Sequence, residues 1–141
     1  METRRLSKWL LVVGCLLTAP LYGNGQTQAA DKSLRLKCMW DLSQDLKTGL
    51  VQRVSGVQML LFKPTGSTYG QLEVEGMATL FAASLSDNYL IAETRYKSGA
   101  TVFTEKVEVN RFTGGIRKWL RWGDRGSLYQ GKCTIVTGPL F

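Results

Sequence analysis

A chain of 141 residues with 18 Lys and Arg against 11 Asp and Glu carries a net charge of +7 and contains no histidine. Because histidine is the commonest general base and a frequent zinc ligand, its absence excludes Ser-His-Asp and Cys-His catalytic arrangements and most zinc sites. The chain also has no phosphate-binding glycine loop and no calcium-loop spacing, so we expect no enzymatic activity, no cofactor and no metal site.

Residues 1–30 have the layout of a secretory signal peptide. Three basic residues precede an uncharged apolar run from Trp9 to Ala19, and a small, polar segment follows. The apolar run is shorter than the about 20 residues that cross a bilayer and matches the about 7–15 residues of a signal peptide. We expect cleavage after residue 25, 29 or 30, and a periplasmic or secreted mature chain without a transmembrane segment.

The same segment allows a second interpretation. Val12-Val13-Gly14-Cys15 is similar to a lipoprotein cleavage box, which would make Cys15 a lipidated N-terminus. The apolar run starts directly after Lys8 and continues past Cys15 through Leu17, so a soluble mature protein is the favoured interpretation.

The predicted mature part, residues 31–141, has the size of a single domain. It contains 15 Lys and Arg and 10 Asp and Glu, a net charge of +5. A positive excess favours anionic partners, although its simplest interpretation is that it keeps the protein soluble. Export directs the protein away from nucleic acid, which we therefore exclude as a partner, and nothing in the sequence indicates the oligomeric state.

Two cysteines remain after cleavage, Cys38 and Cys133. In an oxidising compartment they are most simply interpreted as one disulfide. The rival interpretation, a pair of redox-active thiols, lacks a C-x-x-C spacing and a histidine that would activate a thiolate.

Alternation of apolar and polar residues dominates the mature chain and predicts strands separated by glycine and proline turns. The predicted strands lie at Leu34–Trp40, Val57–Leu61, Leu72–Gly76, Tyr89–Lys97, Thr101–Phe112, Ile116–Trp122 and Ser127–Val136. The continuous apolar stretch 77–85 is either a buried strand or one or two helical turns.

The apolar positions of these strands predict which side chains face the core. They are Leu34, Leu36, Cys38 and Trp40, then Val57, Met59 and Leu61, then Leu72 and Val74, then Leu90, Ala92 and Tyr96, then Phe103, Val107 and Val109, and last Tyr129, Cys133 and Ile135. Both cysteines are among them, which supports the disulfide.

Short strands with frequent turns predict a mainly β protein, a small antiparallel β-barrel or β-sandwich with at most one short helix. That helix is expected either at 41–46 or within the apolar stretch that starts at Met77. Two carboxylate pairs, Glu73 with Glu75 and Asp41 with Asp45, are interpreted as solvated surface residues rather than as an acid–base pair.

The most unusual stretch is 116–122, Ile-Arg-Lys-Trp-Leu-Arg-Trp. In a strand, Arg117, Trp119 and Arg121 share one face, which we expect to be exposed, and Arg125 follows in the next turn. The other face turns to the core, with Lys118 extending its charge to solvent near an edge. Guanidinium groups around an aromatic ring suit phosphates, lipid headgroups, glycans or an acidic protein surface. A purely structural role, in which Trp119 packs on a neighbouring strand beneath the arginines, is the simpler alternative.

The C-terminal third resembles a group of small uncharacterised exported proteobacterial proteins. The resemblance rests on a strand that ends in an N/D-R-x-T-G turn, here Asn110-Arg111-Phe112-Thr113-Gly114, and on the G-x-C of Gly131-Lys132-Cys133 paired with an early cysteine. It implies a fold type and a compartment but no activity.

A second similarity is to periplasmic lysozyme inhibitors of the small β-barrel kind, which are also exported and disulfide-linked. Ser98-Gly99-Ala100 is similar to part of their inhibitory loop, but Val102 and Phe103 stand where a tyrosine is expected. A positively charged domain would also repel a cationic lysozyme.

The sequence thus predicts an exported β-domain protein that acts by binding an anionic envelope component or a partner protein. The alternative is a periplasmic inhibitor or immunity-type protein such as a lysozyme-inhibitor-like barrel. The predicted ligand-binding residues are Arg117, Trp119, Arg121 and Arg125.

Overall fold

The computed structural model describes residues 33–137, which form eight strands and no helix. The predicted signal peptide, its predicted cleavage sites and Cys15 lie outside the described residues. The strands are β1 (Leu34–Asp45), β2 (Val51–Pro64), β3 (Tyr69–Val74), β4 (Phe81–Leu85), β5 (Tyr89–Ser98), β6 (Thr101–Asn110), β7 (Gly115–Trp122) and β8 (Arg125–Ile135).

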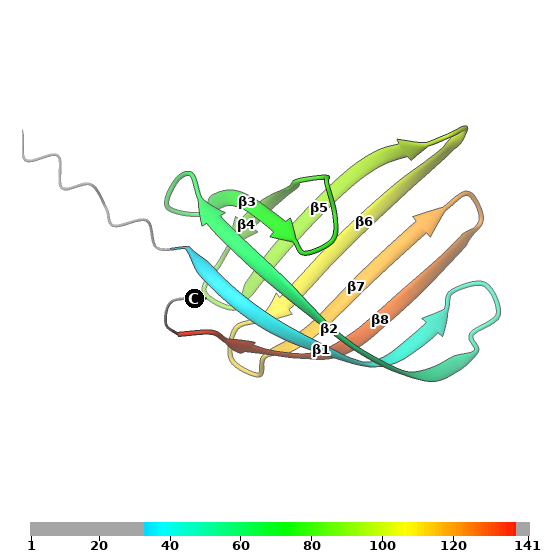
Figure 1. The fold of residues 1–141 in the computed structure, drawn as a ribbon, viewed down its shortest axis with the longest axis horizontal. Helices are drawn as coiled ribbons and strands as arrows, with labels where there is room; N and C mark the ends of the chain where they lie inside the picture. Colours follow the sequence, from blue (N-terminus) through cyan, green and yellow to red (C-terminus); the bar gives the residue numbers. More distant parts are fainter. Residues whose placement is uncertain (1–32, 138–141) are drawn as a thin grey trace, which may run out of the picture.

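Each strand pairs with the next one along the chain, and every pairing is antiparallel. The last strand, β8, pairs with β1 and closes the sheet into a barrel (Figure 1). Closure pairs β1, β6, β7 and β8 on both sides, whereas β2 before Leu60 and β5 after Glu93 are paired on one side only. Of the two predicted architectures, the small antiparallel barrel is confirmed.

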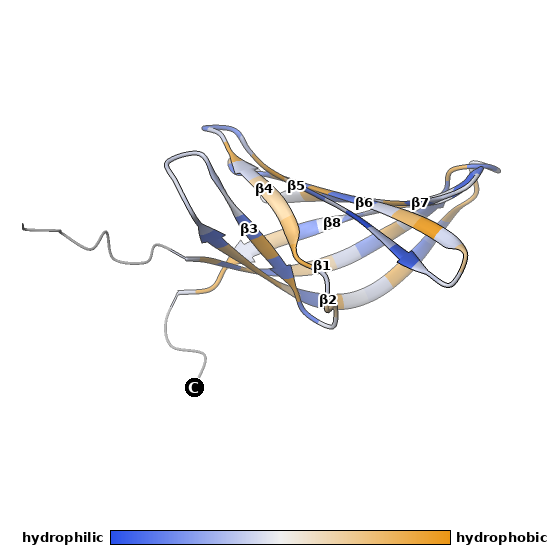
Figure 2. Ribbon diagram, turned by 90° about the horizontal axis from the view of Figure 1, so that it is seen from above, coloured by the Kyte–Doolittle hydropathy of each residue, from blue (hydrophilic) through white to orange (hydrophobic). Residues whose placement is uncertain are grey.

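One half of the barrel interior is a dry core, which we call the apolar half. Hydrophobic and hydrophilic residues alternate along the strands (Figure 2), and the hydrophobic set turns inward. Its buried members are Leu36, Cys38, Leu60, Phe62, Leu72, Val74, Phe81, Ala83, Leu90, Ala92, Val107, Val109, Ile116 and Cys133.

The other half is lined differently because β3 and β4 do not reach it. These two short strands pair with β2 and β5 only over Leu60–Pro64 and Leu90–Glu93. Beyond them the inward-facing side chains are larger, more polar and, apart from Glu105, only partly buried. We call this the aromatic half and define it by Trp40, Tyr96, Phe103, Glu105, Lys118, Leu120, Trp122 and Tyr129.

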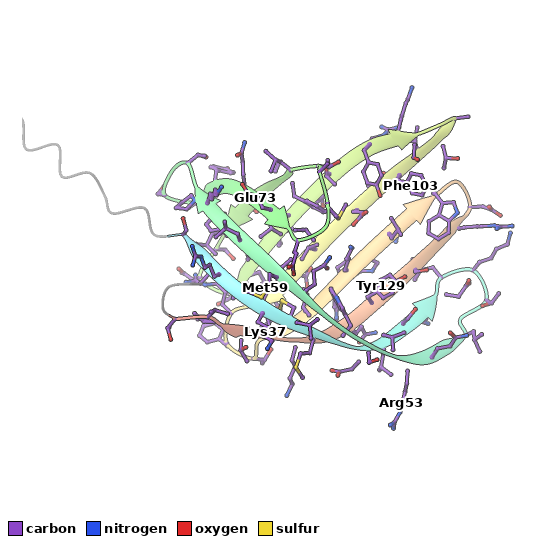
Figure 3. All side chains as sticks on the ribbon, viewed as in Figure 1. Lys37, Arg53, Met59, Glu73, Phe103 and Tyr129 are labelled. Atoms are coloured by element: carbon purple, nitrogen blue, oxygen red, sulfur yellow. A yellow bond between two sulfur atoms is a disulfide. The ribbon has the colours of Figure 1, made fainter. Side chains whose placement is uncertain are left out.

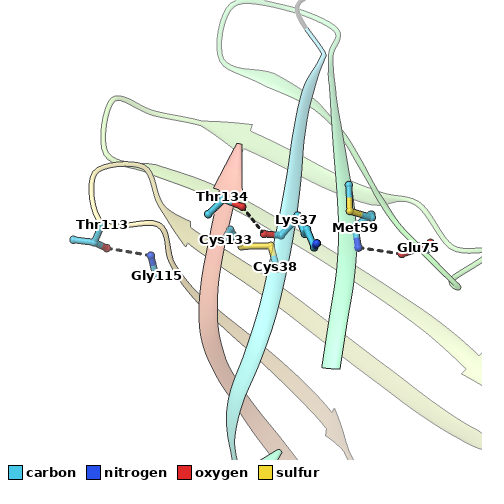
Figure 4. The surroundings of a disulfide bond; sticks show 8 residues. All are labelled: Lys37, Cys38, Met59, Glu75, Thr113, Gly115, Cys133 and Thr134. Carbon is cyan, nitrogen blue, oxygen red and sulfur yellow. Dashed lines mark hydrogen bonds between the residues drawn. A yellow bond between two sulfur atoms is a disulfide. The ribbon is translucent and has the colours of Figure 1, made fainter. Parts of the chain in front are cut away.

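The predicted Cys38–Cys133 disulfide is present and buried. The two cysteines are direct cross-strand partners in β1 and β8, so the bond joins the first strand to the last across the seam that closes the barrel (Figure 4). It spans 95 residues of sequence. Stabilisation of a folded state by a cross-link grows with loop length, so this position stabilises the barrel strongly.

Close backbone approach at the same seam requires glycine at position 131. A Cβ atom added to Gly131 would clash with the carbonyl oxygen of Met39 on β1. No side chain fits there without moving the β1–β8 ladder.

Two predictions about local structure are wrong. No helix forms at 41–46: residues 41–45 complete β1, whose register shifts between Trp40 and Leu42. Of the two interpretations of the apolar stretch 77–85, the strand is confirmed, over Phe81–Leu85. In β2 the inward face is Leu60 and Phe62, whereas Val57 is 58% exposed. In the uninterrupted apolar sequence Met59-Leu60-Leu61-Phe62, periodicity does not distinguish the two faces.

The Asn110–Gly114 motif is a tightly bonded turn between β6 and β7. The Asn110 side chain accepts hydrogen bonds from the amides of Phe112 and Thr113, and Gly114 adopts a positive φ of 71°. Arg111 donates to the carbonyls of the neighbouring β4–β5 turn, at Ser86 and Asp87. The side chains of Asn110, Arg111 and Thr113 therefore each bond within the chain, which explains the motif as a structural turn.

Candidate functional site

The outer face of β7 carries the predicted arginine–tryptophan set. Arg117 and Arg121 are exposed, and Trp119 lies between them, half-buried. The register places Lys106 of β6 directly opposite Trp119, and its ammonium lies 5.7 Å from the centroid of the indole ring. The structure thus confirms that these three residues share one outer face, and it adds Lys106 to them as a third basic group. We call Lys106, Arg117, Trp119 and Arg121 the outer basic patch.

Two carboxylates lie beside the outer basic patch, because the register places Glu108 directly opposite Arg117 and Glu93 directly opposite Lys106. Within residues 33–137, neither Arg117 nor Arg121 forms an ion pair. Lys106 lies 3.8 Å from Glu93, a long and solvent-exposed contact that contributes little. A shallow depression lined by Glu93, Thr104, Lys106, Trp119 and Arg121 lies over the same strands.

Arg125 does not belong to this face. It is the cross-strand partner of Trp122, whose ring points inward toward Phe103, so Arg125 starts on the opposite side of the sheet from Arg121. The structure brings three of the four predicted binding residues together and separates the fourth.

The prediction that Lys118 lies near a strand edge is wrong. Strand β7 is flanked on both sides, and the Lys118 side chain is only 14% exposed, with its ammonium 3.0 Å from Oε2 of Glu105. Glu105 is 3% exposed and is the one buried charged residue of the described chain. The Tyr96 hydroxyl donates a 2.7 Å hydrogen bond to its other oxygen, Oε1.

Burial and the neighbouring carboxylate both act on Tyr96. Desolvation, followed by the hydrogen bond to Glu105 and the negative charge of that residue, raises the pKa of Tyr96 to about 12. The hydroxyl therefore stays protonated and continues to donate throughout the neutral range.

A row of aromatic rings begins at Tyr96, beside Glu105 and Lys118, and continues through the aromatic half. Tyr96 stacks on Phe103 with ring centroids 5.3 Å apart, and Phe103 lies 6.1 Å from Trp122. On the other side of β7, Tyr129 of β8 contacts Trp40 of β1 edge to face, with ring centroids 6.1 Å apart (Figure 3 labels Phe103 and Tyr129). All five rings are only partly buried although they face inward.

Sequence reasoning missed the inward Glu105. The signal was present, because Glu105 falls between Phe103 and Val107 in the period-two pattern of β6. A buried carboxylate is stable only with a basic or hydrogen-bonding partner, and Lys118 on the neighbouring strand β7 also faces inward.

The two carboxylate pairs lie on the outer surface as expected. Glu73 forms an ion pair with Lys63, and Glu75 accepts a hydrogen bond from the amide of Met59. Asp45 accepts bonds from the turn amides of Thr48 and Lys47, and the Thr48 amide is the main reason that its pKa is lowered. Three of these four carboxylates, Asp45, Glu73 and Glu75, are thus used in local bonding.

Several further features of the described part of the chain bear on function. The segment Ser98-Gly99-Ala100 forms the β5–β6 turn, and an inhibitory role for it stays a prediction. Within residues 33–137 no group of three metal-ligating side chains is close enough to hold an ion, and no helix is long and apolar enough to cross a membrane.

Compared with known protein families, curated proteins and solved structures, the chain has no significant match.

Proposed function

We propose that the protein is an exported, non-catalytic binding protein whose outer basic patch engages an anionic component of the cell envelope. The observation that carries this proposal is the position of two exposed arginines, neither in an ion pair within residues 33–137, on either side of a half-buried tryptophan on one strand face. The export pattern of residues 1–30 supports the compartment, and an intramolecular disulfide is consistent with an oxidising environment.

The chemistry of the outer basic patch suits phosphate or carboxylate groups attached to a partly apolar body. Arginine offers planar, bidentate hydrogen bonding to such anions, and the indole between the two arginines offers contact area for the adjacent carbon atoms. Lys106 over the ring of Trp119 adds positive charge without occupying either arginine.

The structural alternative explains Trp119 only in part. The ring does pack beside Lys106 on the neighbouring strand, as that alternative requires. It does not account for Arg117 and Arg121, which are exposed and form no ion pair within residues 33–137. Anion binding gives these two guanidinium groups a partner.

The test is binding to vesicles that contain phosphatidylglycerol, with phosphatidylcholine vesicles as the neutral reference and an anionic polysaccharide as the second probe. Each basic residue near an anionic surface contributes about 1 kcal/mol, so Arg117→Ala with Arg121→Ala should weaken binding about thirtyfold. Added salt should weaken the wild type in the same direction.

A charge-matched control separates the outer basic patch from net charge. Arg53→Ala with Lys97→Ala removes the same charge from exposed positions in β2 and β5, and Figure 3 shows Arg53 pointing away from the barrel. Equal losses for the two double variants would refute a defined site. Retention on neither probe, with capture of a single protein instead, would favour the partner-protein alternative.

A further inference from the structure

The inner side of β7 carries an arrangement unrelated to the outer basic patch. We propose that the aromatic half of the barrel is a binding site for a small, uncharged aromatic molecule that carries a hydroxyl group. The proposal rests on three features of this half: its accessible aromatic wall, its electrically balanced polar floor and an unsatisfied buried oxygen.

The wall is formed by Tyr96, Phe103 and Trp122. Their rings follow one another at 5.3 and 6.1 Å, on strands β5, β6 and β7, and they face inward yet stay partly exposed. Aromatic side chains that face a barrel interior are normally covered by the opposite strands. Here β3 and β4 end before this level, so a planar apolar molecule can stack against the rings.

The aromatic half is flanked by six strands, because β3 and β4 end before it and leave one side uncovered. The apolar half uses its interior for packed side chains, among them Phe62 and Phe81, which are almost fully buried. The inward aromatic side chains of the other half are not buried to the same degree. Molecules of two fused rings are therefore suitable probes of this half.

The floor is the Glu105–Lys118 pair, whose charges balance. A charged ligand would be repelled by the member of the pair that carries the same sign. Its own charge would also have no counter-charge in the site, and burying such a charge is costly. The balanced pair therefore selects an uncharged ligand.

The unsatisfied atom is Oε2 of Glu105. It is buried and forms an ion pair with the Lys118 ammonium at 3.0 Å but accepts no hydrogen bond, while Oε1 is bonded to Tyr96. This oxygen therefore keeps the capacity to accept a hydrogen bond from a further donor. A hydroxyl group can accept from Lys118 and donate to Oε2 at once, after the flexible Lys118 stem changes rotamer. No apolar group or simple ether can do both.

Calorimetric titration of the oxidised protein with naphthol, methoxynaphthalene and naphthoate tests the proposal. Hydrogen bonds to charged groups are strong, so naphthol should bind about ten- to hundredfold more tightly than methoxynaphthalene, and naphthoate should also bind more weakly than naphthol. No binding of naphthol up to its solubility limit would overturn the proposal.

Two substitutions locate the site. Trp122→Ala removes part of the wall and should weaken naphthol binding about tenfold, whereas Tyr69→Ala removes an exposed ring from β3 and should leave it unchanged. Amide NMR shifts on adding naphthol provide an independent readout if Trp122→Ala does not fold. They should cluster at Tyr96, Phe103 and Trp122, and shifts confined to Trp119 and its outer neighbours would overturn the assignment.

The double variant Glu105→Leu with Lys118→Met tests the floor. It replaces the charged pair by apolar side chains of similar volume, a change that proteins often tolerate. The variant should bind naphthol and methoxynaphthalene equally well. A naphthol preference that survives in the folded double variant would show that the hydroxyl is recognised elsewhere, and would overturn the role of Glu105.

Discussion

Breaking the Glu105–Lys118 pair should destabilise the barrel far more than removing both charges together. Removing one partner leaves an uncompensated buried charge, which costs about 3–5 kcal/mol. Glu105 is 3% exposed on a short stem, whereas the 14% exposed Lys118 can extend toward the open end. We therefore expect Lys118→Met to lie at the upper end of that range and Glu105→Leu at the lower end.

The double variant should lose about 1 kcal/mol or less. The remaining loss of stability in the double variant comes from the lost hydrogen bond between the Tyr96 hydroxyl and Glu105. This loss is small because the partly exposed hydroxyl can bond to water instead. Urea denaturation of the wild type, the two single variants and the double variant gives the four free energies of unfolding. The reasoning is refuted if the loss in the double variant equals the sum of the single losses, because independent sites are additive.

Three further predictions concern the fold. Replacing Cys38 and Cys133 together by Ala should lower the free energy of unfolding by up to about 4.7 kcal/mol, the loop-entropy value for the 95 residues spanned, as measured in urea against the oxidised protein. Stability should fall between about pH 10 and pH 12, because an unfolded tyrosine loses its proton near 10 and Tyr96 keeps its proton to about 12 when folded. The loss of stability in that window should be smaller in Tyr96→Phe, measured by urea denaturation at several pH values. Gly131→Ala should lower the melting temperature sharply because its Cβ would meet the Met39 carbonyl, whereas Gly66→Ala meets nothing within 4 Å and should have little effect.

Much of the barrel could be predicted because its strands alternate clearly. The inward faces of β1, β3, β5 and β6 follow from period two, and so does the cysteine pairing, since Cys38 and Cys133 fall on faces that both turn inward. The choice between barrel and sandwich depends on whether β8 returns to β1. That pairing joins the two ends of the domain and leaves no local signal in either strand.

The errors arise where local pattern and tertiary contact disagree. Residues 41–45 have helix-compatible spacing, yet pairing with both β2 and β8 holds them extended. A lysine on an inward face needs either water or an acidic partner, and a strand edge would give Lys118 access to water. In the structure its partner is instead Glu105, which lies diagonally across from it on the neighbouring strand β6. The sequence around Glu105 alone does not predict a buried ion pair. Its partner Lys118 lies on the next strand, so the pattern of a single strand does not reveal the pair.

Strand β7 shows why the two proposed sites can be separated by experiment. Its odd-numbered residues 117, 119 and 121 form the outer basic patch, and the even-numbered residues 118 and 122 line the aromatic half. A slip of one residue would exchange the two faces completely, so both sites depend on one register. That register is fixed at the apolar half, where Gly114 at the start of β7 accepts a 2.7 Å hydrogen bond from the amide of Cys133.

The elements that fix the register and those that present binding groups thus occupy opposite halves of the barrel. The disulfide and the Asn110–Gly114 turn lie with the packed core, and the aromatic rings lie beyond β3 and β4. Substitutions of Trp122 or Arg121 should therefore change binding while the ladder between β7 and β8 persists. Substitutions at the β1–β8 seam should abolish both sites together, since neither site survives without the common register.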